Sequence, residues 1–177
     1  MELNGLNIMV TGGAGFIGSH LVDRLIEMGN HVIVYDNFDE YYAGKKRNIQ
    51  NHLGDPNFHL VKADILEYDR LSEAMNKVDI VFHLAAQTGV RYSLENPIKT
   101  NTVNTTGTLH VLKAAKQNKI RKIIFASSSS IYGEPRYMPV DEKHPTNPVS
   151  IYGASKLAAE GYCRILDLPT VILRYHT

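Results

Sequence analysis

The first apolar run of the chain leads directly into a glycine-rich turn. Residues 6–10 read as a strand, and the turn that follows opens an amphipathic helical pattern. Within the turn, Gly12 permits a tight reversal, Gly15 lets the backbone approach a ligand without a Cβ in the way, and Gly18 lets the helix pack closely on the strand. Because the first N–H groups of a helix bind phosphates, this feature predicts a dinucleotide site at the start of the fold.

A carboxylate follows the second expected strand. The apolar run 31–35 ends in Asp36, about 20 residues beyond the glycines, where a carboxylate can accept both hydroxyls of an adenosine ribose. A 2′-phosphate would be repelled there, so the pair of features predicts NAD rather than NADP. The alternative for Asp36 is a turn residue with no ligand.

Composition and charge narrow the class of protein. The chain has 177 residues, the size of one ordinary domain, and its formal net charge of +1 argues against nucleic acid or a membrane surface as the main partner. No apolar segment approaches the ~20 residues that span a bilayer, and a single cysteine, Cys163, excludes an internal disulfide. The first strand begins too early for a signal peptide. We therefore expect a soluble, cytoplasmic protein, without a metal site.

Strand-like runs alternate with helical patterns along the whole sequence, which is typical of a parallel sheet covered on both faces. We expect a doubly wound α/β fold, the Rossmann fold, in a single domain over residues 1–177, with an irregular proline-rich loop at 134–148. The expected strands are 6–11, 31–36, 57–62, 79–84, 121–127 and 169–175, and the expected helices are 16–28, 67–76, 98–117 and 152–166, with a short one within 44–53.

A tyrosine and a lysine are expected near the carboxyl edge of the sheet. Tyr152 and Lys156 are four residues apart, so on a helix they share one face and the ammonium can approach the phenol. They follow the strand 121–127, whose carboxyl end carries the run Ser127 to Ser130, and open α/β sheets bind ligands at that edge. The alternative for the serines is a polar strand exit without chemistry.

Two other pairs have the same spacing and show that spacing alone means little. Tyr41 with Lys45 and Tyr42 with Lys46 follow Asp36, in the loop expected on the adenosine side. At least some matches of this spacing are therefore accidental.

Together, the ordered motifs resemble the extended short-chain dehydrogenase/reductase family, and most nearly its nucleotide-sugar 4-epimerases. The resemblance covers nearly the whole chain, and the ordered set is far more specific than any one motif. It is carried by residues 11–18, Asp64-Ile65, residues 83–86, residues 104–108, Ser128 and residues 152–156.

The resemblance implies a tightly held NAD and a UDP-sugar substrate. Ser128, Tyr152 and Lys156 would be the catalytic residues. The residues implied to hold NAD are Gly12, Gly15, Phe16, Ile17, Gly18, Asp36, Asn37, Asp64, Ile65, Leu84, Ala85, Ala86, Asn104, Tyr152 and Lys156. Those implied to contact the sugar are Thr88, Arg91, Ser128, Ser129, Tyr152 and His176.

The catalytic roles have a physical basis of their own. Removing hydride from C4 of a sugar requires the hydroxyl proton to leave as well, and a tyrosine with a pKa of about 10 is a poor base at neutral pH. A neighbouring ammonium and the positive charge of oxidised nicotinamide both favour the phenolate, so we expect Tyr152 to be the base, tuned by Lys156. Ser128 would hold the same sugar oxygen and position C4.

The residues after Ser128 separate reaction types within the family. Dehydratases typically carry an Asp-Glu pair there and uronate decarboxylases a glutamate, whereas this chain has Ser129 and Ser130. This favours epimerisation of the UDP-glucose/UDP-galactose type. A UDP-glucuronate 4-epimerase is the alternative, because residues 87–97 resemble both groups and Thr177 is more typical of the uronate enzymes. Arg91 would pair with a C6 carboxylate, unless it is a solvated surface residue.

The family continues into a smaller C-terminal substrate domain, whereas this sequence ends at Thr177. The resemblance therefore predicts a chain truncated after the sixth strand, without that domain. A cofactor-binding module without turnover, and a reductase that releases NADH, are the alternatives from other classes. The helices 98–117 and 152–166 resemble the family's dimer surface and predict a homodimer, although their apolar stripes can also pack on the sheet alone.

Overall fold

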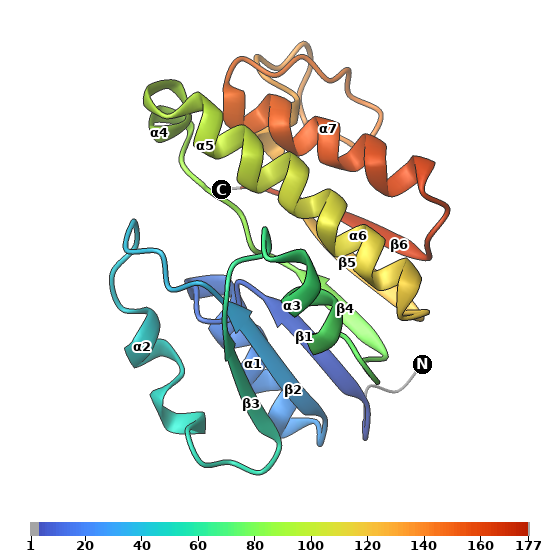
Figure 1. Ribbon diagram of the computed structural model, residues 1–177. Coiled ribbons are helices and arrows are strands. Elements are labelled where there is room, and N and C mark those ends of the chain that lie inside the picture. The colour runs from blue at the N-terminus through green and yellow to red at the C-terminus, as the bar shows by residue number, and fades with distance from the viewer. Residues whose placement is uncertain (1–3, 177) are drawn as a thin grey trace.

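A parallel sheet forms the centre of the structure, a computed structural model that describes residues 4–176. Over these residues the sheet has six strands in the order β3-β2-β1-β4-β5-β6 (Figure 1). The chain therefore winds outward from β1 to β3, returns to the other side of β1, and winds outward again. The strands are β1 (Asn7–Thr11), β2 (His31–Asp36), β3 (Phe58–Lys62), β4 (Ile80–His83), β5 (Lys122–Ser128) and β6 (Thr170–Tyr175).

Helices cover both faces of this sheet, which confirms the doubly wound α/β fold. Alternate residues of β1 show the two faces: Ile8 and Val10 join a core with Val22 and Leu25 of α1, whereas Met9 packs in the core that contains residues of α3, α6 and α7. The helical elements are α1 (Phe16–Glu27), α2 (Lys45–Asn48), η1 (Gln50–His52), α3 (Tyr68–Ala74), α4 (Val90–Glu95), α5 (Pro97–Asn101), η2 (Thr102–Thr106), α6 (Gly107–Gln117), η3 (Ser129–Ile131) and α7 (Ile151–Ile165).

The structure differs from the expected elements in several places. The helix expected over 98–117 consists of α5, a π-helical turn η2 and α6. Helix α4, within 87–97, was not expected, because its six residues are too few to show a helical period. Strand β5 extends to Ser128, one residue beyond the expected end. Residues 134–148 contain no helix or strand, as expected.

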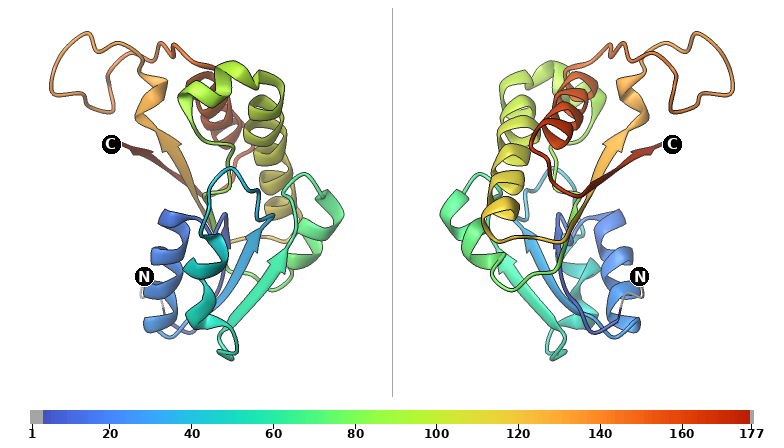
Figure 2. Two further views of the ribbon diagram at one scale, coloured as in Figure 1. Left: turned by 90° about the vertical axis from the view of Figure 1, so that its left-hand side faces the viewer. Right: turned by 90° about the vertical axis from the view of Figure 1, so that its right-hand side faces the viewer.

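The half of the sheet formed by β4, β5 and β6 is covered unevenly. Figure 2 shows α6 and α7 on one side of β5 and β6. On β6, Val171, Leu173 and Tyr175 alternate with less exposed residues and remain between 37% and 39% exposed. Among the described residues, no helix has the length and apolar character needed to cross a membrane.

Candidate cofactor and substrate cleft

The carboxyl ends of β1, β2, β4 and β5 open into one cavity of about 730 Å³. This volume lies in the range typical of small-molecule sites. Strand order reverses between β1 and β4, and ligands of open α/β sheets bind at such a point. The lining comes from residues 12–18, 35–48, 63–65, 84–90 and 126–130, together with Lys99, Val103, Tyr152, Lys156 and Tyr175.

Most of the predicted site residues line this cavity. The structure thus brings together segments from the start, middle and end of the sequence. The predicted residues that line it are Gly12, Gly15, Phe16, Ile17, Gly18, Asp36, Asn37, Asp64, Ile65, Leu84, Ala85, Ala86, Thr88, Ser128, Ser129, Tyr152 and Lys156.

Three predicted residues lie outside the lining. Asn104 is buried, and its amide exchanges hydrogen bonds of 2.8 and 3.0 Å with the backbone of Gln87, so it braces the wall instead. Arg91 extends into solvent and pairs with Glu95 at 3.4 Å. His176 stacks on Tyr132, with ring centroids 6.0 Å apart. Thr177, on which the comparison of hexose and uronate enzymes partly depends, is outside the described residues.

The glycine turn forms an anion cradle at the start of α1. Gly15 is the N-cap of α1 and supplies no side-chain cap, so the first N–H groups of the helix remain available to a ligand. Gly12 has φ +72°, and a Cβ there would lie 2.8 Å from the backbone nitrogen of Ala85. Phe16 and Ile17 are 76% and 54% exposed at the cavity, which is unusual for large apolar side chains. These features fit a dinucleotide pyrophosphate.

Asp36 is buried at the end of β2 and held by three donors. Its Oδ1 accepts hydrogen bonds from the Phe38 N–H at 2.8 Å and the Lys45 ammonium at 3.0 Å. Its Oδ2 accepts only the Ala14 N–H, at 3.2 Å, among the described residues. The oxygen Oδ2 therefore keeps a lone pair for a ribose hydroxyl. Lys45, which shares the Tyr-x-x-x-Lys spacing with Tyr41, also lines the cavity.

Tyr152 lies in the first turn of α7 and lines the cavity. Its N–H donates to the Ser93 hydroxyl of α4 at 3.1 Å, which fixes the helix start. Burial raises the pKa of the Tyr152 phenol, a hydrogen bond from Ser128 lowers it, and the nearby Tyr42 raises it further. The net effect is a raised pKa, so the phenol retains its proton at neutral pH in this structure.

Lys156 has a different environment from the one the helical spacing predicts. Its ammonium is buried, donates to the Ala126 carbonyl at 2.9 Å and lies 5.0 Å from the centroid of the Phe125 ring. Burial lowers its pKa to about 8. The shift of the Tyr152 phenol has burial, Ser128 and Tyr42 as its causes, and its tuning by this ammonium stays a prediction. The carbonyl of β5 competes for the ammonium, and spacing along one helix cannot show that.

Ser127 and Ser128, which are adjacent at the end of β5, have different hydrogen-bond partners. Ser127 donates to Glu160 at 2.6 Å, and Arg174 holds the same buried carboxylate through bonds of 3.0 and 2.8 Å. Burial raises the pKa of Glu160, but the hydrogen bonds from Arg174 and Ser127 outweigh it and lower the pKa overall. Ser128, in contrast, forms a hydrogen bond with the Tyr152 phenol.

Sequence reasoning missed one wall of the cavity. Tyr41 and Tyr42 line it, together with Asp39 of the same loop and Lys99 of α5. The available signal was the two adjacent tyrosines in a loop of small and polar residues, where large aromatic side chains need a partner. Tyr41 packs on Tyr42 and on Tyr92 of α4, the helix that the sequence did not predict.

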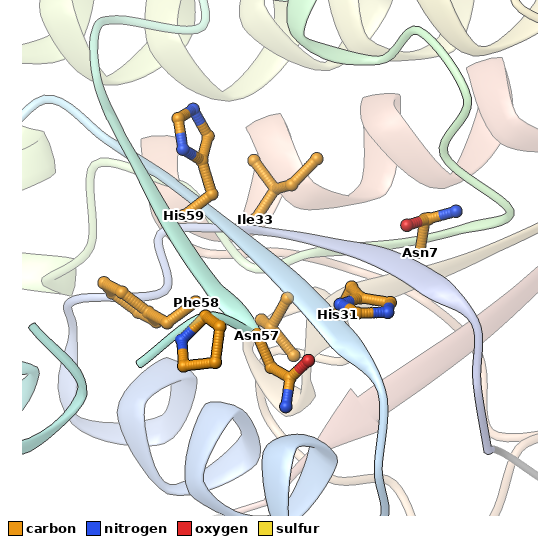
Figure 3. Close-up of a pocket in the computed structure, with 8 residues that line it drawn as sticks. Asn7, His31, Ile33, Asn57, Phe58 and His59 are labelled. Atoms are coloured by element: carbon orange, nitrogen blue, oxygen red, sulfur yellow. The ribbon is translucent and has the colours of Figure 1, made fainter. Parts of the chain in front are cut away.

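A smaller hollow of about 310 Å³ lies at the opposite, amino edge of the sheet (Figure 3). Asn7, His31, Asn57 and His59 contribute its polar side chains. Figure 3 shows His59 and Asn7 well apart rather than converging on one point. The chemistry of the molecule therefore concentrates at the carboxyl edge.

A doubly wound sheet with a glycine turn at its switch point, and a serine, a tyrosine and a lysine at its carboxyl edge, defines an extended short-chain dehydrogenase/reductase. Comparison with family models narrows this further. Residues 9–169 match the model described as GDP-mannose 4,6 dehydratase, and the chain belongs to this family.

Individual relatives are nucleotide-sugar enzymes. A protein of Methanocaldococcus jannaschii, named provisionally as a UDP-glucose 4-epimerase, is 47% identical over 175 residues, which are 95% of this chain and 54% of that protein. The UDP-glucuronic acid 4-epimerase of Bacillus cereus, solved with UDP-glucuronic acid and NAD, is 39% identical with a TM-score of 0.91, over 97% of this chain and 57% of its own. The UDP-glucose 4-epimerase of Brucella ovis, solved with NAD, is 36% identical with a TM-score of 0.85, over 98% and 52%. The chain thus spans about half the length of these relatives.

Proposed function

We propose that this chain, over residues 1–177, is the NAD-binding domain of a UDP-sugar 4-epimerase of the UDP-glucose/UDP-galactose type. The observation that supports this most is that a single cavity joins the glycine turn and Asp36 to Ser128 and Tyr152. The relatives solved with NAD support the choice of cofactor. The absence of a carboxylate at positions 129 and 130 argues against dehydration, although the family model carries a dehydratase name.

Each group of residues along the cleft would contact a different part of the cofactor or the substrate. The N–H groups at the start of α1 would bind the pyrophosphate, Asp36 the adenosine ribose, and the Asp64-Ile65 segment the adenine. Tyr152 would take the proton of the C4 hydroxyl and later return it, while Ser128 holds that oxygen in place. When bound, oxidised NAD supplies the hydride acceptor for C4 and a positive charge that favours the Tyr152 phenolate.

A UDP-glucuronate 4-epimerase is the second candidate, favoured by the likeness to the Bacillus cereus enzyme. The one cationic residue proposed for the C6 carboxylate, Arg91, extends into solvent and pairs with Glu95. We therefore rank the hexose substrates first.

Addition of NAD alone, and of NAD together with UDP-galactose or with UDP-galacturonate, to the purified chain tests this proposal. We expect NAD to bind, UDP-galactose to be converted to UDP-glucose, and Tyr152→Phe to lower that rate at least 100-fold while NAD still binds. NAD binding without conversion of either sugar would instead support a module without turnover. Free NADH that accumulates would support a reductase, and faster conversion of UDP-galacturonate would support the uronate enzyme.

Lys156→Met should stabilise the chain while weakening NAD binding at least tenfold. Burial lowers the pKa of Lys156 from 10.5 to about 8, which means that burying the charged ammonium lowers the free energy of unfolding by about 3 kcal/mol. Methionine avoids this cost but loses the hydrogen bond to Ala126, which contributes about 1 kcal/mol. We expect a net gain of about 2 kcal/mol at pH 7, measured by urea unfolding. Because the unfolded lysine keeps its proton up to pH 10.5, the wild type gains stability from pH 8 to 10.5, and above that interval it should be the more stable by about 1 kcal/mol.

The matched control is Lys113→Met, which alters a lysine 4.4 Å from the Tyr68 ring, away from the cleft. It should change neither NAD affinity nor the pH profile. A Lys156→Met variant less stable than the wild type would contradict the role of burial.

We also propose a homodimer formed through α5, α6 and α7. Leu109 on α6 and Ile165 at the end of α7 are exposed apolar side chains that such an interface would cover. Sedimentation of a monomer at micromolar concentration would contradict this.

A further inference from the structure

The segment 37–44, called the strap below, joins β2 to α2 and runs along the cleft. It begins beside Asp36, at the proposed adenosine end, and its Tyr42 is near enough to Tyr152 to raise the pKa of that phenol. Figure 2 (left) shows the strap rising from β2 towards α4 and α5. Its residues on the cavity are Asn37, Asp39, Tyr41, Tyr42 and Ala43. The strap therefore spans the length of the proposed NAD site.

An ion pair ties the strap to the other half of the molecule. The Lys99 ammonium of α5 donates to Asp39 Oδ2 at 2.8 Å, while Asp39 Oδ1 accepts the N–H of Tyr41 at 2.9 Å. The hydrogen bond with Lys99 is the main reason that the pKa of Asp39 is lowered, and it raises the pKa of Lys99 in turn. One carboxylate thus organises the strap and connects it to α5.

An aromatic contact lies beside this ion pair, since the Lys99 ammonium is 5.9 Å from the centroid of the Tyr92 ring. The rings of Tyr41 and Tyr92, the latter on α4, have centroids 4.5 Å apart. Gly89, immediately before α4, makes room for this contact: a Cβ there would lie 2.7 Å from the Tyr41 hydroxyl, and its φ of +96° already favours glycine. The ion pair and the ring contact, together called the latch, hold the strap from two independent elements.

We propose that the latch keeps the strap closed over the bound dinucleotide and slows its release. This rests on the proposed function, since it assumes that NAD occupies the cavity. The strap lines the cavity, so a dinucleotide that runs from Asp36 to Tyr152 would contact it along its length. An enzyme that takes hydride from a substrate and returns it regenerates its cofactor each cycle. Slow release of the cofactor therefore does not limit the turnover rate of such an enzyme.

A direct role of Lys99 in binding NAD makes a different prediction, because Lys99 also lines the cavity. If its ammonium attracted the pyrophosphate directly, then Asp39→Asn would free the ammonium and tighten NAD binding. If the ion pair is a latch, Asp39→Asn and Lys99→Met both speed release. The two variants together therefore separate the latch from simple charge attraction.

The experiment follows the release of NADH by its fluorescence after dilution into excess NAD. We expect Asp39→Asn and Lys99→Met each to speed release about threefold, and Lys99→Met combined with Tyr41→Ala about tenfold. The control is Arg121→Met, which breaks a comparable ion pair with Asp79 remote from the cleft: side-chain exposures are 57% and 28%, against 47% and 29% for Lys99 and Asp39. Circular dichroism establishes that each variant is folded.

The outcomes separate the two proposals. If the wild type binds NADH and Asp39→Asn releases it no faster than Arg121→Met, the latch is wrong and the proposed function stands. Slower release from Asp39→Asn would also overturn the latch, in favour of direct attraction by Lys99. A wild type that binds no NADH would overturn both.

Discussion

Gly18→Ala is expected to destabilise the chain by about 4 kcal/mol and to weaken NAD binding at least 100-fold. A Cβ at position 18 would lie 2.3 Å from the Gly12 carbonyl oxygen and 2.7 Å from the Gly13 Cα. Both obstacles are backbone atoms, so no side chain can rotate away. The turn and α1 would have to separate, which moves the N–H groups that cradle the pyrophosphate.

A second glycine provides a control of opposite sign. Gly161 also lies in a helix, α7, and a Cβ there meets nothing within 4 Å. Because alanine favours the helix over glycine, Gly161→Ala should stabilise the chain by about 1 kcal/mol and leave NAD binding unchanged. Urea unfolding and NAD titration of both variants measure the contrast. Equal effects of the two substitutions would mean that close packing at Gly18 is unimportant.

The chain should lose stability in mild acid because of His83, at the end of β4. Its Nδ1 and Nε2 bond to the hydroxyls of Thr11 and Thr108 at 2.8 and 3.0 Å. Thr108 donates its own proton to the Asn104 carbonyl, so it accepts from Nε2 and leaves Nδ1 as an acceptor for Thr11. Burial, with a smaller contribution from the charge of Lys156, lowers the pKa of His83 to about 3. The folded state therefore holds a neutral imidazole.

The sign and window of this effect follow from the two pKa values. The unfolded histidine binds a proton near pH 6.5 and the folded one only near pH 3, so the free energy of unfolding falls as the pH drops through that interval. The loss due to His83 alone is about 2 kcal/mol at pH 5. Urea unfolding between pH 7 and pH 4 measures it.

Two substitutions separate His83 from the other titrating groups. His83→Gln keeps hydrogen-bonding atoms without a titration, so its stability should fall less steeply with acid than that of the wild type, whatever its stability at pH 7. His59→Gln changes an exposed histidine of β3 and should retain the wild-type slope. Parallel slopes for wild type and His83→Gln would show that His83 is not the group responsible.

The arrangement of the sheet is predictable from the sequence, because buried parallel strands are continuous apolar runs. The run 31–36 matches β2 at both ends, and the expected strand 169–175 begins only one residue before β6. The glycine turn and Asp36 follow from the same logic, since a strand, a turn and a helix in sequence fix where a ligand can approach.

Contacts between distant segments account for what could not be predicted. Asp39 and Lys99 are 60 residues apart, and no local pattern connects them. The spacing of Tyr152 and Lys156 gives the shared helix face correctly, but the Ala126 carbonyl that holds the ammonium comes from β5. Asn104, implied to contact NAD, lies in η2 and donates to the carbonyl of Gln87, 17 residues before it in the sequence.

The central claim is that NAD lies along the cleft with its nicotinamide beside Tyr152, and a crystal structure of this chain grown with NAD measures that directly. We predict the pyrophosphate at the first turn of α1, the adenosine ribose on Asp36, and the nicotinamide between Ser128 and Tyr152. A dinucleotide bound in the reverse direction, or bound outside the cavity with Tyr152 free of contact, would contradict the account.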